Sequence, residues 1–224
     1  MKIKELIESN GSADAILSDY PTFCKQWNIT SSIKKIGSGN FGTVYDIGNS
    51  KILKTTSDRN EATASSYSMG KKLKYTWKVD FVGIFKAGKF RNQFVIIGEK
   101  LNKLSGKDVD IFDELYETAF GSGNFDDDFK RTKNYNDWLN YMKDNEKQFR
   151  SAYKDMVKYP KHAEWEYKAL KELLDSGIQY GDNHGENILK GGSSWKFVDL
   201  GGWSKSPVGK IERINENQGI IKII

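Results

Sequence analysis

The stretch IGSGNFGTVY, residues 36–45, places Gly37, Gly39 and Gly42 at the spacing G-x-G-x-x-G. Phosphate-binding turns of two kinds share this spacing: one kind opens a helix after a strand, and the other joins two strands. Strand-like residues lie on both sides of these glycines, and Val44 continues the second run. The stretch therefore predicts a glycine-rich hairpin whose backbone amides can approach phosphate oxygens. An ordinary tight hairpin turn is the alternative.

A lysine follows this hairpin on a second strand-like run, KILK at residues 51–54. Because side chains alternate along a strand, Ile52 is expected on the same face as Lys54. Ile52 and Val44 would then form an apolar roof over an adenine, Lys54 would point at phosphates, and Phe41 would cap the loop tip. A solvated surface lysine is the alternative for Lys54.

Two polar strings in the second half of the chain carry the remaining chemistry. In IQYGDNHGENILK, residues 178–190, Asp182 precedes Asn187 by five positions, and Asp199 follows an apolar run in FVDLGGW, residues 197–203. The first carboxylate can orient a hydroxyl nucleophile, while the carboxamide and the second carboxylate are hard oxygen ligands for magnesium. A polar turn rich in Asn, Gly and Asp is the alternative.

The pattern around these strings changes from strands to helices, which predicts an α+β protein. The strand-like runs cover residues 33–36, 43–47, 51–54, 80–86 and 93–97, with one helix at 60–73, and they predict an antiparallel sheet. Helices are expected at 108–120, 135–158 and 162–174, and a hairpin at 188–190 and 195–198. The expected divisions are an N-terminal helical extension (1–30), a strand-rich part (31–101) and a helical part (102–224).

Composition excludes several classes of protein. The 224 residues are 38% hydrophobic with only three Pro, so the chain is expected to fold. Cys24 is the single cysteine and there are two histidines, which excludes an intrachain disulfide and a Cys/His zinc cluster. The longest apolar run is four residues, 94–97, so no membrane span is expected and a cytoplasmic location is favoured. The net charge of +5 permits polyanion binding, but no specific nucleic acid is predicted.

Together, the glycine-rich stretch with its following lysine and the two polar strings resemble the signature set of the protein-kinase-like superfamily, over about three quarters of the chain, residues 33–203. The resemblance implies a bilobal fold: a small antiparallel N-lobe sheet with one helix, and a reduced, mostly helical C-lobe. It implies catalytic roles for Asp182, Lys54 and Asn187, and magnesium ligands at Asn187 and Asp199. For ATP it implies the contacts Gly37, Ser38, Gly39, Asn40, Phe41, Gly42, Val44, Ile52, Lys54, Glu61, Glu99 and Leu101. Glu61, the only acid on the helix at 60–73, is the candidate partner of Lys54.

The chain departs from typical protein kinases in four places. Tyr180 stands at the histidine of H-R-D, and Leu200 replaces the phenylalanine of D-F-G. The loop G-D-x-H-x-x-N, residues 181–187, looks more like that of aminoglycoside phosphotransferases and of compact phage kinases, for which the host cytoplasm would be the location. Only 23 residues follow Gly201 in this sequence, so a late helical docking subdomain is not expected in it.

The leading hypothesis is an ATP- and magnesium-dependent protein kinase that transfers the γ-phosphate to Ser, Thr or Tyr hydroxyls of a protein substrate, with autophosphorylation as a further expectation. The first alternative is a small-molecule kinase similar to aminoglycoside phosphotransferases. The second is a catalytically silent, kinase-like binding module.

Overall fold

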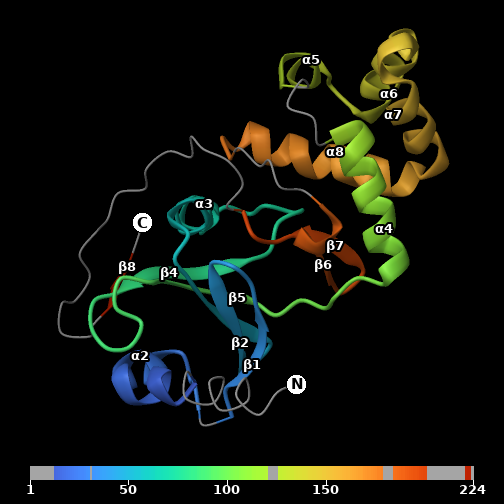
Figure 1. The fold of residues 1–224 in the computed structure, drawn as a ribbon. Coiled ribbons are helices and arrows are strands. Elements are labelled where there is room, and N and C mark those ends of the chain that lie inside the picture. The colour runs from blue at the N-terminus through green and yellow to red at the C-terminus, as the bar shows by residue number, and fades with distance from the viewer. Residues whose placement is uncertain (1–12, 31, 121–125, 179–183, 201–219, 223–224) are drawn as a thin grey trace. The chain divides into compact units, whose positions relative to one another are not determined.

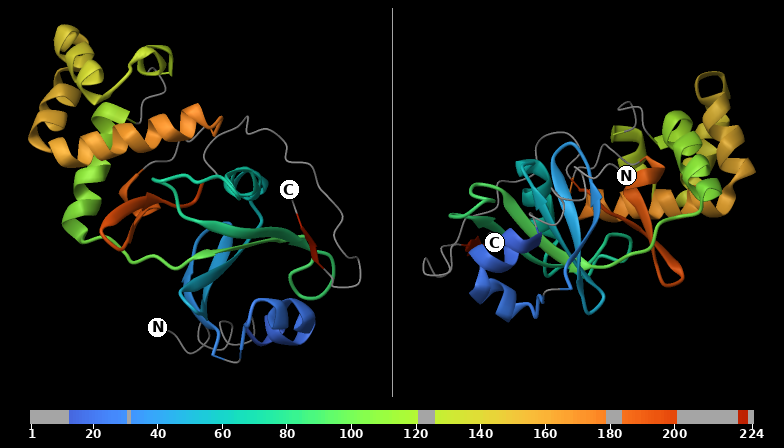
Figure 2. Two further views of the ribbon diagram at one scale, coloured as in Figure 1. Left: turned by 180° about the vertical axis from the view of Figure 1, so that it is seen from behind. Right: turned by 60° about the horizontal axis from the view of Figure 1, so that its bottom comes forward.

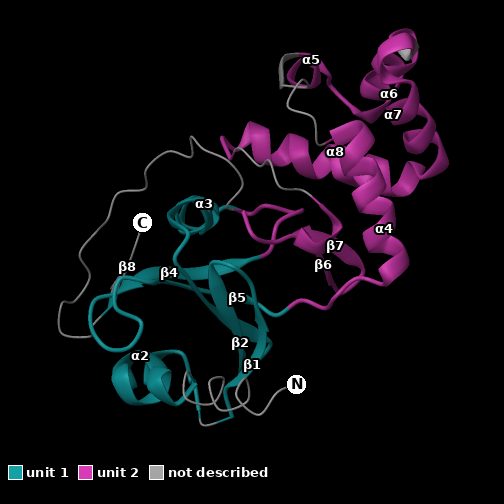
Figure 3. Cartoon of the chain, viewed as in Figure 1, with its two compact units in different colours: residues 1–71, 78–100, 207–224 teal, residues 72–77, 101–206 magenta. Residues whose placement is uncertain are grey.

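The computed structural model describes residues 13–30, 32–120, 126–178, 184–200 and 220–222 (Figure 1). The chain forms two compact units (Figure 3). Unit 1 comprises residues 1–71, 78–100 and 207–224, and unit 2 comprises residues 72–77 and 101–206. In the described part of the chain, no helix is long and apolar enough to cross a membrane.

Unit 1 is built on a six-stranded sheet in the order β1-β2-β3-β5-β4-β8, in which every neighbouring pair is antiparallel. The strands are β1 (Lys34–Ser38), β2 (Gly42–Gly48), β3 (Lys51–Thr56), β4 (Val79–Phe85), β5 (Phe94–Glu99) and β8 (Ile220–Lys222). The five expected strands and the α+β class are confirmed. The sixth strand, β8, extends the sheet at β4, so residues 220–222 belong to unit 1 and not to the helical part.

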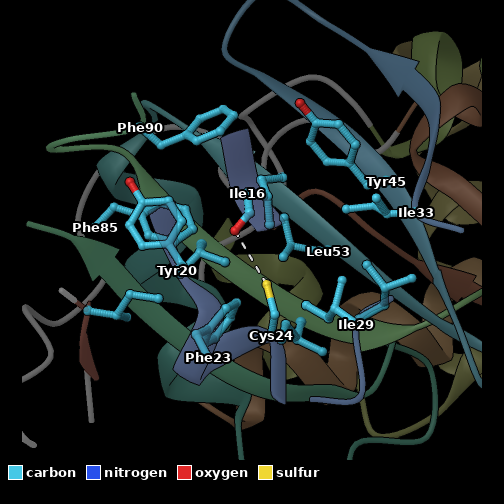
Figure 4. Close-up of a cluster of buried hydrophobic side chains, with 14 of the residues drawn as sticks. Ile16, Tyr20, Phe23, Cys24, Ile29, Ile33, Tyr45, Leu53, Phe85 and Phe90 are labelled. Atoms are coloured by element: carbon cyan, nitrogen blue, oxygen red, sulfur yellow. Dashed lines mark hydrogen bonds between the residues drawn. The ribbon is translucent and has the colours of Figure 1, made fainter. Parts of the chain in front are cut away.

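The two faces of this sheet carry different residues. One face packs on the N-terminal helical segment, residues 13–19 and α2 (Pro21–Gln26), through a core that includes Tyr20 and Leu53 (Figure 4). The described part of the expected N-terminal extension is therefore a layer of unit 1. Helix α3 (Arg59–Ser68) lies on the opposite side of the sheet (Figures 1 and 2).

Unit 2 is mostly helical and includes a small hairpin of β6 (Ile188–Gly191) and β7 (Ser194–Phe197), as predicted. A buried cluster that includes Trp138, Met142 and Met156 joins several of the helices. Its helices are α4 (Gly106–Leu115), α5 (Asp126–Arg131), α6 (Tyr135–Asp144), α7 (Glu146–Lys158) and α8 (Pro160–Asp175), with a π-helix at Tyr116–Phe120 and a 3-10 turn at Gly185–Asn187.

Helix boundaries differ from the sequence expectation where a side chain or a glycine competes with the helix. The expected helix at 135–158 is wrong as one element, because the Asn145 amide donates to the Tyr141 carbonyl at 2.9 Å and the chain breaks there. The helix expected to continue to residue 73 ends at Ser68, just before Gly70 with φ +83°. The last long helix begins at Pro160, because proline is compatible with the first helical turn.

Candidate active site

The glycine-rich stretch forms the predicted hairpin between β1 and β2. Its turn is closed by the Gly39 N–H, which donates to the Gly42 carbonyl at 3.0 Å. The loop is tied to the end of β3, because the Ser57 N–H and Oγ both donate to the Phe41 carbonyl, at 2.8 and 3.2 Å. The Phe41 side chain at the tip is 63% exposed, as a residue that caps a ligand from above would be.

The packing around the loop requires glycine at one of its three glycine positions and leaves space for a Cβ at the other two. A Cβ on Gly42 would lie 2.0 Å from the Thr55 carbonyl oxygen, so only glycine allows β2 and β3 to pair there. A Cβ on Gly37 or Gly39 would meet no atom within 4 Å. The described fold therefore gives no steric reason for glycine at these two positions, while the space beside their backbone suits the close approach of a phosphate.

Lys54 lies on the sheet face expected for it. The register pairs Lys54 with Val44 across β2 and with Ile96 across β5, and Ile52 lies two residues along the same face. This face is the one opposite the buried Tyr45 side chain. The expected grouping of two apolar side chains with one lysine is present in unit 1.

Helix α3 supplies the partner of Lys54. The Asp58 carboxylate caps the helix by accepting from the Asn60 N–H at 2.8 Å, and this start places Glu61 in the first turn. Glu61 is 1% exposed and its carboxylate forms an ion pair with the Lys54 ammonium. Because a buried carboxylate is costly without a cation, the pair holds the ammonium at one position on the sheet face.

Unit 2 brings Asn187 to the start of the segment that carries Asp199. The Val198 N–H donates to the Asn187 carbonyl at 2.9 Å, one residue before Asp199. The Asn187 Nδ2 lies 3.1 Å from the His184 Nε2, so the amide N–H donates to the ring nitrogen. The Asn187 Oδ1 then points away from the histidine. Asp199 has φ +55°, a conformation that costs free energy in a residue with a Cβ and is concentrated at functional sites.

The turn that carries Asn187 is fixed by a residue that the sequence reasoning missed. The Gly185 N–H donates to the Asp113 carboxylate of α4 at 2.6 Å. A Cβ on Gly185 would lie 2.5 Å from the Val109 carbonyl, so α4 packs directly on this turn. The contact spans 72 positions, and nothing near Asp113 in the sequence signals it.

The expected adenine-binding segment begins at Glu99, the last residue of β5. Its N–H donates to the Lys78 carbonyl at 3.0 Å, and its Oε1 accepts from the Lys78 N–H at 2.7 Å. The next N–H, of Lys100, donates to the Ser50 carbonyl at 2.8 Å. Leu101 is the first residue of the longer segment of unit 2, and its role toward a nucleotide stays a prediction.

The candidate residues thus fall into two described groups. Unit 1 holds the glycine loop with Val44, Ile52, Lys54 and Glu61, and unit 2 holds Asn187 and Asp199. Asp182 lies outside the described residues. Among the described residues, no three His, Cys, Asp or Glu side chains gather to hold a metal. One carboxylate and one amide fit magnesium nonetheless, because this ion is commonly completed by water and substrate phosphates.

Comparison with known proteins gives a likeness of fold only. No family model matches the chain and no curated protein matches it. Two structures of a thermostable mutant of aminoglycoside phosphotransferase APH(4)-Ia match at 10% identity and a TM-score of 0.38: the apo form, over 81% of this chain and 71% of that one, and a ternary complex with ADP and hygromycin B, over 82% and 71%. The GDP and kanamycin complex of APH(2")-IIia matches at 10% identity and a TM-score of 0.37, over 85% and 72%. The aminoglycoside phosphotransferases belong to the protein-kinase-like superfamily that the motifs resemble. At these TM-scores the likeness carries no argument about the activity of this chain.

Proposed function

We propose that the protein is an ATP- and magnesium-dependent phosphotransferase of the protein-kinase-like kind. The observation that carries the proposal is the ion pair of Lys54 with the buried Glu61, on the sheet face that also presents Val44 and Ile52. A buried ion pair is weak evidence of a stabilising role, because apolar residues of similar volume often serve as well. A role in holding the Lys54 ammonium against phosphate oxygens would explain why this position carries an ion pair.

The residues present fit a nucleotide and its metal. The open space beside Gly37 and Gly39 leaves the loop backbone accessible to phosphate oxygens. The Asn187 Oδ1 and the Asp199 carboxylate are the oxygen ligands that magnesium prefers. Magnesium bound there would neutralise charge on the phosphates.

The chain's own residues then act mainly by positioning and by electrostatic stabilisation. Glu61 orients the Lys54 ammonium, which donates to phosphate oxygens as their charge increases. Asp182 orients the acceptor hydroxyl and takes its proton as the γ-phosphoryl group moves to the oxygen and ADP leaves. His184 and Asp113 act indirectly: one orients the Asn187 amide, and the other holds the turn through Gly185.

We propose a protein hydroxyl as the acceptor, because G-x-G-x-F-G-x-V-Y resembles the loop of protein kinases more than that of small-molecule kinases. The second candidate is a small-molecule kinase, which is favoured by the loop G-D-x-H-x-x-N. In that case the acidic stretch at residues 125–129 would be a candidate surface for a cationic substrate. One of its acids, Asp128, already accepts from the Tyr141 hydroxyl at 2.6 Å.

The test is incubation of the purified protein with γ-labelled radioactive ATP and magnesium in three reactions: alone, with a cell lysate, and with a panel of aminoglycosides. Asp182→Asn and Asp199→Asn serve as inactive variants, and Asp110→Asn, an acid of α4 outside the candidate site, is the matched control. We expect label on protein that is lost in both inactive variants and retained in the control.

Each other outcome selects a different function. Label on aminoglycoside and none on protein would select the small-molecule kinase. Full transfer by Asp182→Asn would overturn the proposed catalytic loop. Absence of both transfer and ATP binding would leave the non-catalytic binding module.

A further inference from the structure

A pocket of about 270 Å³ lies within unit 2, and none of its lining residues is a candidate nucleotide or magnesium residue. Three segments form its walls: residues 74–75 before β4, one face of α8, and the β6–β7 turn with the start of β7. All three segments belong to the same compact unit, as the magenta ribbon shows (Figure 3). The pocket is therefore a candidate binding site of its own.

Hydrogen bonds fix the first wall in place. The Glu172 carboxylate of α8 accepts from the N–H groups of Lys74 and Tyr75, at 2.7 and 2.9 Å. The Tyr75 carbonyl accepts from the Phe197 N–H at 2.8 Å, and the Lys74 carbonyl accepts from the Lys196 ammonium at 2.6 Å. Because these bonds join all three segments, the pocket is preformed.

The lining carries an excess of positive charge. Lys74, Lys161 and Lys168 face a single acid, Glu164, which pairs with the Lys168 ammonium at 2.5 Å. Two of the three cations are thus in excess over the acid. The ammonium of Lys161 lies 5.4 Å from the centre of the Trp195 ring, a side chain that also lines the pocket. A ligand that matches this wall carries negative charge.

Rigid aromatic rings form much of the remaining wall. The Trp165 and Trp195 ring centres lie 5.7 Å apart at 83°. Trp195 is itself stacked on His162, with ring centres 4.6 Å apart, so its plane is fixed. Ser193 and Ser194 lie at the turn beside these rings, and the Ser194 hydroxyl donates to the Trp195 carbonyl at 3.1 Å. The lining therefore combines aromatic rings with ammonium groups.

We propose that this pocket binds an aryl phosphate, a phosphate monoester carried on a single aromatic ring. The phosphate would lie between the ammonium groups of Lys74 and Lys161, and the ring would pack against the indoles. The volume is slightly below the roughly 300–1,000 Å³ of pockets for drug-sized ligands, which fits one ring with a phosphate and not a dinucleotide. The ligand could be a phosphotyrosine side chain or a free aryl phosphate. The proposal does not rest on the phosphotransferase function.

The test is calorimetric titration of the full chain with phenyl phosphate, phosphotyrosine, inorganic phosphate and phenol, in the presence of saturating ADP and magnesium. We expect phenyl phosphate to bind more tightly than phosphate or phenol, because it engages both the cations and the rings. Tighter binding of phosphotyrosine than of phenyl phosphate would select the protein side chain as the source, and the reverse would select a free aryl phosphate.

Charge-removing variants locate the binding. Lys161→Gln and Lys74→Gln should each weaken it about tenfold, because each removes a charge-assisted hydrogen bond. Lys161→Arg should retain it, and Lys154→Gln, an exposed lysine of α7 outside the pocket, should not change it. Unchanged thermal unfolding shows that the variants fold. Absence of binding, equal binding of phenol, or binding that survives both glutamine variants would overturn the proposal.

Discussion

The two faces of the unit 1 sheet use the same strands for different purposes. Leu53 and Lys54 are neighbours on β3, yet Leu53 is fully buried among N-terminal helix side chains and Lys54 faces the opposite side with Val44. The first face is a closed hydrophobic layer (Figure 4). The second carries an ion pair and open space beside two loop glycines. Alternation along a strand thus separates the residues that stabilise the sheet from those proposed to bind the nucleotide.

The largest effect is expected at Lys54. Lys54→Met should lower phosphoryl transfer about 100- to 1,000-fold, the usual cost of removing one electrostatic donor. It should also cost about 3–5 kcal/mol of stability, because Glu61 is left buried without a cation. The double variant Lys54→Met/Glu61→Gln should regain stability and not activity, as measured by chemical unfolding and by γ-phosphate transfer.

The matched control lies three residues earlier on the same strand. Lys51 pairs with Asp80 on the sheet at 2.6 Å, and its side chain is 33% exposed. Lys51→Met should change transfer less than about twofold, because side chains alternate along the strand and Lys51 lies on the face opposite Lys54. Equal loss of activity in both lysine variants would remove the distinction between the two faces.

Leu53→Ala should show the opposite pattern. Truncation of this fully buried side chain is expected to cost about 2–5 kcal/mol. At a temperature where the variant remains folded, its KM for ATP should equal that of the wild type. The measurements are thermal unfolding and steady-state kinetics, and a raised KM without loss of stability would contradict the assignment of the faces.

The loop glycines should separate stability from nucleotide binding in the same way, with smaller effects. Gly42→Ala should cost about 1–3 kcal/mol of stability, because its Cβ would meet the Thr55 carbonyl. Gly39→Ala should leave stability within about 1 kcal/mol of the wild type and raise the KM for ATP several-fold. Equal KM values for Gly39→Ala and the wild type would show that the open space beside the loop has no role in nucleotide binding.

The smallest effect is expected for the reactivity of Cys24, which lies in the hydrophobic layer on the first face of the sheet. Cys24 is 5% exposed, and burial raises the pKa of its thiol from 9.0 to about 11. At about pH 8 this shift lowers the thiolate fraction about 100-fold, so the folded protein should react slowly with iodoacetamide. Reaction in guanidinium chloride is the control, and equally fast alkylation of the folded protein would show that this face opens readily.

Much of the fold could be predicted from the sequence because its signals are local. Alternating apolar residues located the five strands, and the glycine spacing located the hairpin. The break at Asn145 was missed, because it depends on one amide that bonds to Tyr141 while the apolar pattern continues on both sides. The placement of residues 72–77 was also missed, because the pairing of Thr76 with Phe197 joins distant segments.

The candidate site divides in the same way. The single acid on the next helix predicted the ion pair of Lys54 with Glu61, which the structure contains. The roles of Lys54, Asn187 and Asp199 toward a nucleotide stay predictions. The supporting contacts could not be predicted, because Asp113 reaches Gly185 across the fold and Glu172 reaches residues 74–75 from α8. Such contacts depend on tertiary packing and leave no periodic signal in the chain.

Hydrogen exchange read by mass spectrometry, with and without ATP and magnesium, tests most directly whether the Lys54 face binds the nucleotide. We predict slower exchange in the glycine loop (residues 36–45), in β3 and in the turn at residues 184–187, with no change at residues 13–29 beneath the closed face. Protection centred on residues 13–29, or none in the loop and β3, would contradict this assignment.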